Sequence, residues 1–383
     1  MPRKEIAMQA LIKLAILLTA FVVNSANAQT PVAPSPQFIT IDGTNLTAKL
    51  EAARKQGQTR ATRFWTAYSF DVRSGIAMDA DVYNNSSTTW VNGVMIGSNY
   101  ETRNLAVFLL HEPSGNALPR LELYNLERKR EYSGYPVYWL GRANNEESLK
   151  LLKGLVDNQS DERIKDRATQ AIALHDDQRV GGILKTLSQK SNPVNVRKTA
   201  LFWLGHAEGE RDYLASIVRD EQETLEVRKQ AAFGLGVNKD KAVLPTLQSL
   251  YAAVTPRELK RQLIFAASIN ENKDAAVDFL IQVASNDSER ELKKQAMFWL
   301  GQKAGDRSLK FLSDVLEKND GDTEVQKQAV TALGQRHKDE AIPLLIKIAK
   351  THQSLAVRKQ AIFWLGQSGD ERALAFFKEI FAQ

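Results

Sequence analysis

The sequence contains no cysteine, and this absence excludes several chemistries together. Without cysteine there is no disulfide framework, no thiolate metal ligand, no cysteine nucleophile and no lipid-modified cysteine. Gly-rich phosphate loops, Gly-x-Ser-x-Gly and zinc-protease helix motifs are also missing. The histidines have no short metal-ligand spacing, so we expect scattered surface residues, no metal and no cofactor. They are His111, His175, His206, His337 and His352.

Long apolar runs are scarce, and the clearest lies at the N-terminus. Three basic residues precede an apolar run at residues 14–23, and the small residues of Ala26-Asn27-Ala28 follow it. This order is typical of a secretory signal peptide. An uncleaved anchor is the alternative, but ten residues fall short of the roughly 20 that span a bilayer. We expect residues 1–28 to be removed and the mature protein to be periplasmic or extracellular, with no membrane span.

Charge of one sign is not strongly in excess. The formal net charge is +6, and removal of the leader would lower it to about +4. Such a mild excess is weak evidence for a polyanionic partner. We therefore expect no nucleic-acid binding.

The most informative feature present is a repeated decapeptide. Residues 357–366 read Val-Arg-Lys-Gln-Ala-Ile-Phe-Trp-Leu-Gly, and related segments end at residues 141, 173, 205, 236, 268, 301 and 334. A period near 32 residues that is sustained along the chain indicates a solenoid. We expect about eight two-helix repeats over residues 131–383, and hence a mainly α fold.

The decapeptide is expected to be the second helix of each pair. Its first, fifth and ninth slots, such as Val357, Ala361 and Leu365, lie one turn apart and form a buried stripe. Its terminal glycine suits a helix C-cap with a positive φ. The basic residues of slot two are expected to form exposed ion pairs with nearby carboxylates. They are Arg197, Arg228, Lys260, Lys293 and Arg358.

The pattern Val-Arg-x-x-Ala-x-x-x-Leu-Gly resembles the short HEAT repeats of phycobilisome-lyase-like proteins, over residues 132–383. The resemblance implies a HEAT-type α-solenoid whose second helices line the concave side, but it transfers no activity. A deoxyhypusine-hydroxylase-like enzyme would need several His-Glu pairs, and the sequence offers His111-Glu112 alone. A chromophore lyase is not favoured either, because the leader directs the chain out of the cytoplasm.

The N-terminal third has a different texture. Residues 29–60 are expected to form a proline-rich linker and a short helix at 46–55. Residues 61–130 are expected to form a small antiparallel β domain of four or five strands, because apolar and polar residues alternate and turn formers separate the runs. Alternating acids such as Asp71 are expected on the wet face of that sheet. Its strands are expected at 64–72, 76–83, 89–96, 101–111 and 118–126.

Slots three, four and seven form the candidate binding site. They hold a cation, a glutamine and a phenylalanine in most repeats, so stacked repeats would present three parallel rows along the concave side. Thr331 interrupts the aromatic row. The predicted binding residues are Lys198 and Phe202; Lys229, Gln230 and Phe233; Arg261, Gln262 and Phe265; Lys294, Gln295 and Phe298; and Lys359, Gln360 and Phe363.

Two interpretations of these rows are open. Rigid aromatic anchors beside hydrogen-bonding groups are the composition of a protein or peptide site. Alternatively, the phenylalanines pack between neighbouring repeats and the lysine stems cover the rings. The tryptophans of slot eight, Trp203, Trp299 and Trp364, are expected in the core. The lysine row does not favour nucleic acid, because rows about 10 Å apart exceed the screening length of about 8 Å.

The function most consistent with these features is that of an exported, non-enzymatic scaffold that binds a protein or peptide along the solenoid. One alternative is an enzyme, or an enzyme subunit, with a site in the β domain or at its junction with residues 135–139. Another is a structural component of the envelope. The sequence leaves the oligomeric state and the identity of the partner open.

Overall fold

The computed structural model describes residues 38–78, 89–91, 94–96, 101–115, 117–318 and 322–382. The expected signal peptide at 1–28 and most of the expected linker lie outside these residues. The chain divides into two compact units, Met1–Trp203 and Leu204–Gln383, which are described separately. Within the described ranges, no helix combines the length and the apolar character needed to cross a membrane.

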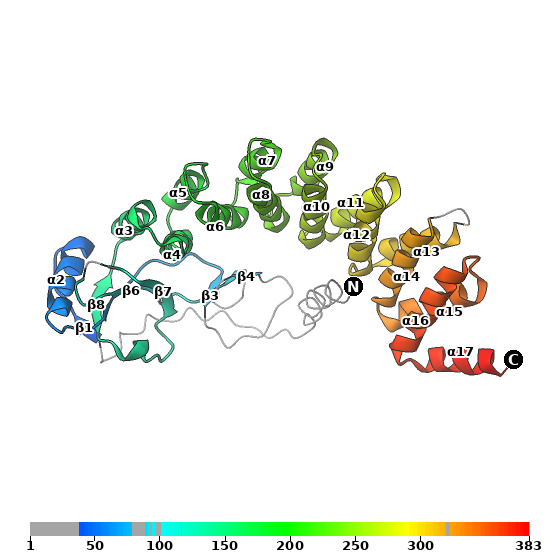
Figure 1. Ribbon diagram of the computed structural model, residues 1–383, viewed down its shortest axis with the longest axis horizontal. Helices are drawn as coiled ribbons and strands as arrows, with labels where there is room; N and C mark the ends of the chain where they lie inside the picture. The colour runs from blue at the N-terminus through cyan, green and yellow to red at the C-terminus, as the bar shows by residue number, and fades with distance from the viewer. Residues whose placement is uncertain are drawn as a thin grey trace. The chain divides into compact units, whose positions relative to one another are not determined.

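The first unit contains a five-stranded sheet with the order β1-β8-β2-β6-β7 (Figure 1). The pairs β2·β6 and β6·β7 are antiparallel, whereas β8 runs parallel to both β1 and β2. The strand pairs described within the predicted β domain, residues 61–130, are antiparallel as expected, and the parallel pairs are added by β1 and β8 from outside that range. The strands are β1 (Phe38–Thr40), β2 (Phe64–Ser69), β6 (Leu105–His111), β7 (Arg120–Asn125) and β8 (Val137–Arg142).

The boundary predicted at residue 130 is wrong, because β8 belongs to this sheet. The supposed first copy of the repeat, residues 132–141, forms the short 3-10 helix η1 (Tyr132–Gly134) and most of β8 instead of a helix of a pair. The reason is tertiary: Val137 and Trp139 of this segment pair with Trp65 and Ala67 of β2. Hydrogen bonding to a neighbouring strand overrides a weak helical pattern here.

Both faces of β2 are covered, whereas the side chain of Asp71, just after this strand, is exposed as expected. On one face, Tyr68 lies against Ser148 of α3 (Asn145–Asn158). On the other face, the crossover from β7 to β8 brings Tyr132 onto Phe108, with stacked rings whose centroids are 5.0 Å apart. Trp65 is fully buried there and its indole nitrogen donates to the Tyr132 carbonyl.

A second, three-stranded sheet of the order β3-β5-β4 follows β2 in the chain. Its strands are antiparallel, and β4 and β5 form a hairpin within the single strand expected at 89–96. The strands are β3 (Ile76–Met78), β4 (Thr89–Val91) and β5 (Val94–Ile96). Residues 79–88, which contain the rest of the strand expected at 76–83, lie outside the described residues.

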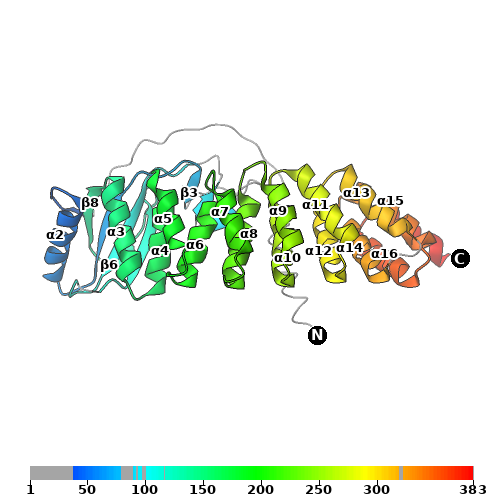
Figure 2. The same cartoon turned by 90° about the horizontal axis from the view of Figure 1, so that it is seen from above.

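The helices confirm the solenoid. The expected short helix appears as α2 (Leu46–Gln58), and from Asn145 to Ser368 the described residues form seven consecutive helix pairs and are followed by α17 (Figures 1 and 2). About eight repeats were expected. The first helices of the pairs are α3, α5 (Arg179–Leu187), α7 (Arg211–Arg219), α9 (Val243–Ala253), α11 (Lys273–Asn286), α13 (Asp306–Glu317) and α15 (Lys338–Thr351). The second helices are α4 (Glu162–Ala173), α6 (Val194–Gly205), α8 (Leu225–Val237), α10 (Arg257–Ile269), α12 (Arg290–Gly301), α14 (Thr323–Gly334) and α16 (Leu355–Ser368), and α17 spans Glu371–Phe381.

The decapeptide occupies the second helix of each pair, as predicted. Its stripe is buried in α16, where Val357, Ala361 and Leu365 are at most 1% exposed. The role expected for the terminal glycine is wrong, because Gly301 has no positive φ and is the last residue of helix α12 itself, not a cap after it. A Cβ at Gly301 would lie 2.7 Å from the carbonyl oxygen of Ala332 in α14. The glycine is needed because adjacent second helices meet at backbone contact.

The basic residues of slot two act differently from the prediction. Arg228 is buried, and its Nε donates to the carbonyl of Val218 at the end of α7, at 2.9 Å. Arg197 and Lys293 similarly donate to the backbone carbonyls of Ser188 and Ser285. These side chains satisfy carbonyl groups that a helix C-terminus leaves without intrahelical partners. Even Gln326, which breaks the basic row, donates to the Lys318 carbonyl at 2.7 Å.

Candidate functional site

The candidate site lies on the second helices, and most of it belongs to the second unit. Helices α8, α10, α12, α14 and α16 lie side by side there, each packed against the next, and we call them the second-helix layer (Figures 1 and 2). Lys198 and Phe202 sit on α6 in the first unit. They are therefore not treated as part of one continuous surface with the others.

Phenylalanines of slot seven in α8, α10 and α12, together with Trp299 of slot eight, form an aromatic ridge in part of the layer. The rings of Phe233 and Phe265 stack at a centroid distance of 6.2 Å, and Phe265 lies 5.4 Å from Trp299. Phe298 meets the same indole edge-on at 5.0 Å. All four side chains are half-buried. The rings thus pack between repeats and also keep part of their surface open, so each interpretation of the row holds in part.

The tryptophans of slot eight are less uniform than expected. Trp203 is buried in the first unit, which confirms the prediction for this residue. Trp299 and Trp364 are only half-buried. Trp364 lies where a Cβ at Gly334 would stand, at 2.3 Å from an indole carbon. This glycine therefore makes room for a ring, whereas Gly301 makes room for a backbone.

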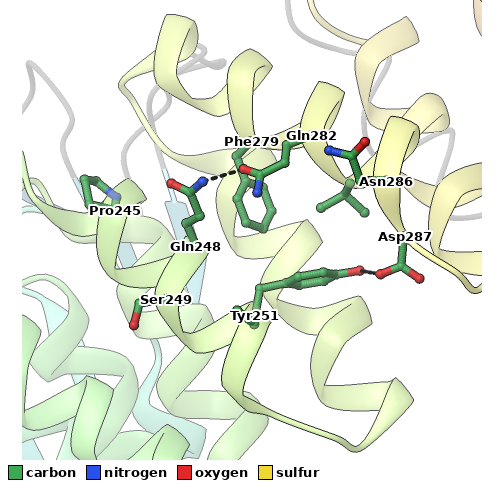
Figure 3. A pocket seen from close by; sticks show the side chains of 10 residues that line it. Pro245, Gln248, Ser249, Tyr251, Phe279, Gln282, Asn286 and Asp287 are labelled. Carbon is green, nitrogen blue, oxygen red and sulfur yellow. Dashed lines mark hydrogen bonds between the residues drawn. The ribbon is translucent and has the colours of Figure 1, made fainter.

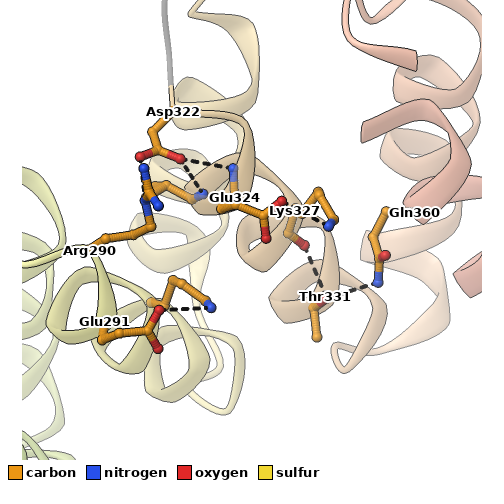
Figure 4. Close-up of polar contacts among 9 residues, drawn as sticks. Arg290, Glu291, Asp322, Glu324, Lys327, Thr331 and Gln360 are labelled. Atoms are coloured by element: carbon orange, nitrogen blue, oxygen red, sulfur yellow. Dashed lines mark hydrogen bonds and ion pairs between the residues drawn. The ribbon is translucent and has the colours of Figure 1, made fainter. Parts of the chain in front are cut away.

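The ridge is interrupted in α14. Thr331 replaces phenylalanine, and its hydroxyl accepts a hydrogen bond from the Gln360 amide at 3.2 Å and donates to the Lys327 carbonyl (Figure 4). Beyond it, Phe363 is 54% exposed and contacts Trp364 edge-on at 5.8 Å. Phe363 is therefore separated from the ridge by a polar repeat.

The cations of slot three are paired with acids that the sequence-based prediction of the site did not include. A glutamate three residues earlier on the same helix meets each of four cations, and Figure 4 shows the pair of Glu324 and Lys327. This i,i+3 spacing was visible in the sequence. The four pairs are Glu226–Lys229 at 3.5 Å, Glu258–Arg261 at 3.6 Å, Glu291–Lys294 at 3.2 Å and Glu324–Lys327 at 3.0 Å.

These pairs are solvent-accessible, so each adds at most about 1 kcal/mol to stability. The pairs matter more for the charge of the surface, because the four glutamates neutralise most of the predicted cationic row. In α16, Ala356 replaces the glutamate and Lys359 is exposed.

The glutamines of slot four bridge neighbouring repeats. Gln295 accepts a bond from Arg261 Nε at 3.2 Å, and its own amide donates to the Arg261 carbonyl at 3.1 Å. Gln360 bonds Thr331 in the same way across one repeat boundary. Gln230 and Gln262 are half-buried at the same slot. The amides therefore have a structural role in addition to any contact with a partner.

The remaining predicted residues are on α6. Lys198 and Phe202 are half-buried, and the Phe202 ring meets Trp203 edge-on at 5.4 Å.

Two histidines are not on the surface, contrary to the prediction. His175 is 2% exposed and stacks on Phe70 at 4.1 Å. Its Nδ1 bonds the Ala171 carbonyl, which can only accept, so Nε2 accepts the hydroxyl proton of Ser148 at 2.7 Å. The Ser148 oxygen in turn contacts the Tyr68 hydroxyl at 3.1 Å. Burial lowers the pKa of His175 to about 4.

His111 is the second buried histidine. It stacks on Phe64, contacts the Thr66 hydroxyl at 2.9 Å and is fully buried, and burial lowers its pKa to about 3. A serine beside a neutral histidine is the chemistry of a nucleophile, but Ser148 and His175 are both buried and out of reach of a substrate. Across the described ranges, no group of three acids or histidines is placed to hold a metal ion.

Comparisons with known proteins support the fold. Residues 309–383 match the family model described as HEAT repeats. No curated protein matches the sequence significantly.

Three solved structures are similar to part of this chain. Human deoxyhypusine hydroxylase in complex with glycerol is 18% identical, with 61% of this chain and 89% of that chain covered and a TM-score of 0.30. The CpcE–CpcF complex of phycocyanin lyase from Nostoc is 17% identical, with 61% and 92% covered and a TM-score of 0.31. A structure of Kap95p with RanGDP is 17% identical, with 57% and 35% covered and a TM-score of 0.37.

Identities and scores this low transfer no activity and no partner to this chain. The matched residues 309–383 contain most of α13 and all of α14 to α17, and the earlier helix pairs repeat the same decapeptide. Residues 309–383 are therefore HEAT repeats, and the earlier helix pairs are further units of the same α-solenoid type.

Proposed function

We propose that the second-helix layer binds a protein or peptide partner through the aromatic ridge of Phe233, Phe265, Trp299 and Phe298. The ridge carries the proposal because its rings are held by contacts with one another and still keep part of their surface open. Rigid aromatic side chains lose little conformational entropy on binding, which is why they dominate the energetics of many interfaces.

The polar surroundings of the ridge favour a polypeptide over a polyanion. Four slot-three cations are compensated by glutamates on the same helices, so the row attracts phosphate groups only weakly. Glutamine side chains beside the rings can donate to and accept from a peptide backbone. Binding is expected to depend on apolar contact and to change little with salt concentration.

The proposed location of this interaction is outside the cytoplasm. The support is the order of basic residues, apolar run and small residues within positions 1–28. Expression of the full chain and of a version lacking residues 2–28, followed by fractionation, tests this location. Export of both versions, or of neither, would refute the proposed signal peptide.

The binding proposal is tested with a triple substitution of Phe233, Phe265 and Phe298 by alanine. The full chain and the variant are used as bait with the exported protein fraction, and captured partners are compared by mass spectrometry. Loss of a partner by a variant that retains its helical circular dichroism and cooperative melting supports the ridge. The matched control is Phe381→Ala, which removes a ring that is 83% exposed on α17.

Equal capture by the folded triple variant and the wild type would disprove the role of the ridge. Since the rings are half-buried, a second variant with tyrosine at the same three positions keeps the stacking. This variant is expected to fold and to retain the partner.

A further inference from the structure

A pocket opens on the opposite set of helices, away from the residues of the proposed function. It has a volume of about 480 Å³ and lies between α9 and α11, the first helices of two successive repeats (Figure 3). Ligand pockets typically have volumes of about 300–1,000 Å³. No residue of the second-helix layer lines it, so a ligand of this pocket would bind independently of the partner proposed for the ridge.

Two aromatic rings form the apolar part of the pocket. Tyr251 of α9 and Phe279 of α11 meet edge-on, with centroids 5.5 Å apart and planes at 89°. In Figure 3 the Tyr251 ring forms a floor and Phe279 stands behind it. A planar group can therefore lie on one ring and contact the other.

The polar part consists of side-chain oxygens held in fixed positions. Asp287, in the loop after α11, accepts the Tyr251 hydroxyl proton on Oδ2 at 2.7 Å and the Glu289 amide on Oδ1 at 2.7 Å. Gln248 and Gln282 hydrogen-bond to each other across the pocket. A carboxylate has about four acceptor positions, so Asp287 keeps acceptor capacity for a ligand.

Asp287 is the charged residue among those that line the pocket, and its carboxylate attracts a cation, whereas the nearby Glu289 is paired with Arg257. Burial, followed by the carboxylates of Asp287 and Glu289, raises the pKa of Tyr251, so its hydroxyl remains a neutral donor. Lys260 does not line the pocket, yet its Nζ lies 5.2 Å from the centroid of the Tyr251 ring. A guanidinium at this ring would lie near a like charge, so its ion pair with Asp287 has to outweigh that repulsion.

We propose that this pocket binds a guanidinium group, stacked on Tyr251 and hydrogen-bonded to Asp287. A guanidinium is planar, stacks on aromatic faces and presents several donors in its own plane to carboxylate and amide oxygens. An ammonium group lacks the flat face, and an anion would meet the Asp287 carboxylate. The group comes either from an arginine side chain of a polypeptide or from a small free guanidino compound.

The test uses methyl NMR of the full chain, because Val283 lines the pocket and reports on occupancy. The probe is N-acetyl-arginine methylamide, and the matched probe is the neutral citrulline derivative. We expect a saturable shift of the Val283 methyl signals with arginine and about tenfold weaker binding of citrulline. Equal binding of both probes, or no saturable shift with arginine, would overturn the proposal.

Variants separate the pocket from general surface charge. Asp287→Asn is expected to weaken binding about tenfold while keeping an acceptor for the Glu289 amide. Asp314→Asn is the matched control on α13, where Asp314 pairs with Lys310, and it is expected to leave binding unchanged. Undiminished binding by Asp287→Asn, with its other methyl signals unmoved, would also overturn the proposal.

Free arginine distinguishes the two sources. Weaker binding of free arginine than of the capped derivative supports a polypeptide ligand. Equal or stronger binding supports a small guanidino compound in the same site.

Discussion

At the scale of single residues, the buried histidines carry the strongest consequence. His111 and His175 are neutral inside the first unit, with pKa values lowered to about 3 and about 4 by burial. In the unfolded chain a histidine has a pKa of about 6.5. The unfolded state therefore takes up protons first as the pH falls, so stability is lost between about pH 6.5 and pH 4 for His175 and between about pH 6.5 and pH 3 for His111.

We predict that the free energy of unfolding of the first unit falls by up to about 1.4 kcal/mol per pH unit for each histidine in this window. His175→Gln is expected to be less stable at pH 7 and to show a shallower pH dependence. The slope is measured by urea unfolding at several pH values, with pulsed hydrogen exchange of α4 as the local probe. His352→Gln in the second unit is the control, and an unchanged slope in His175→Gln would contradict the assignment.

At the scale of elements, the spacing of the second helices depends on glycine. A Cβ at Gly301 would overlap the backbone of Ala332, whereas the nearest atom to a Cβ at Gly366 is Phe377 Cζ at 4.0 Å. Both glycines lie within helices and neither has a positive φ. Glycine at the last position of the decapeptide is therefore required for packing in α12, but it can be replaced in α16.

Alanine is predicted to have opposite effects at these two positions. Gly301→Ala should destabilise the second unit by about 1–3 kcal/mol, because overpacking displaces α14. Gly366→Ala should stabilise it by up to about 1 kcal/mol, since alanine favours the helix and meets no neighbour. Urea unfolding of both variants checks this. If Gly301→Ala were as stable as Gly366→Ala, the close approach would not matter energetically.

The loops that follow the second helices also join neighbouring elements. Asn270 donates its amide protons to the carbonyls of Gly236 and Asn238, and Asn238 does the same to Gly205 and Ala207. In a later repeat, Arg336 has the same role as these asparagines and donates to the carbonyls of Lys303 and Gly305. These side chains satisfy buried backbone groups between repeats.

At the scale of the whole molecule, the main contacts of each repeat in the described part of the second unit are with its neighbours. Helix α14 packs against α12, α13, α15 and α16. In such an array, stability is approximately a sum of local terms and interfaces between adjacent repeats. A defect should therefore spread over one or two repeats and then fade.

We predict this locality for Leu333→Ala in α14, a fully buried site where truncation costs about 2–5 kcal/mol. Hydrogen exchange should accelerate in α12 to α16 and remain unchanged in β2, β6 and β8. Leu109→Ala in β6 is the matched control with the reverse pattern. Acceleration of the sheet by Leu333→Ala would show cooperativity that nearest-neighbour contacts do not explain.

The repeat made most of the helical architecture predictable. The period located the second helices, and the stripe of Val357, Ala361 and Leu365 is buried as expected. The sequence also predicted the three candidate rows, but not the acids that pair with the cations or the contacts between the rings. The pairing of Lys229 with Glu226 is a local signal that the sequence carries at i,i+3 spacing, whereas the contact of the Phe265 ring with Trp299 depends on how neighbouring repeats are rotated.

The sequence by itself determined the local and periodic part of this protein. This part comprises the helices that have one buried apolar face, their order along the chain and their regular stacking. Tertiary structure alone decided which segment became β8, why Gly301 is small and where Asp287 meets Tyr251. The reason is physical. Periodicity reports which face of an element is buried, whereas pairing, close approach and pockets depend on the partner that the fold brings against that face.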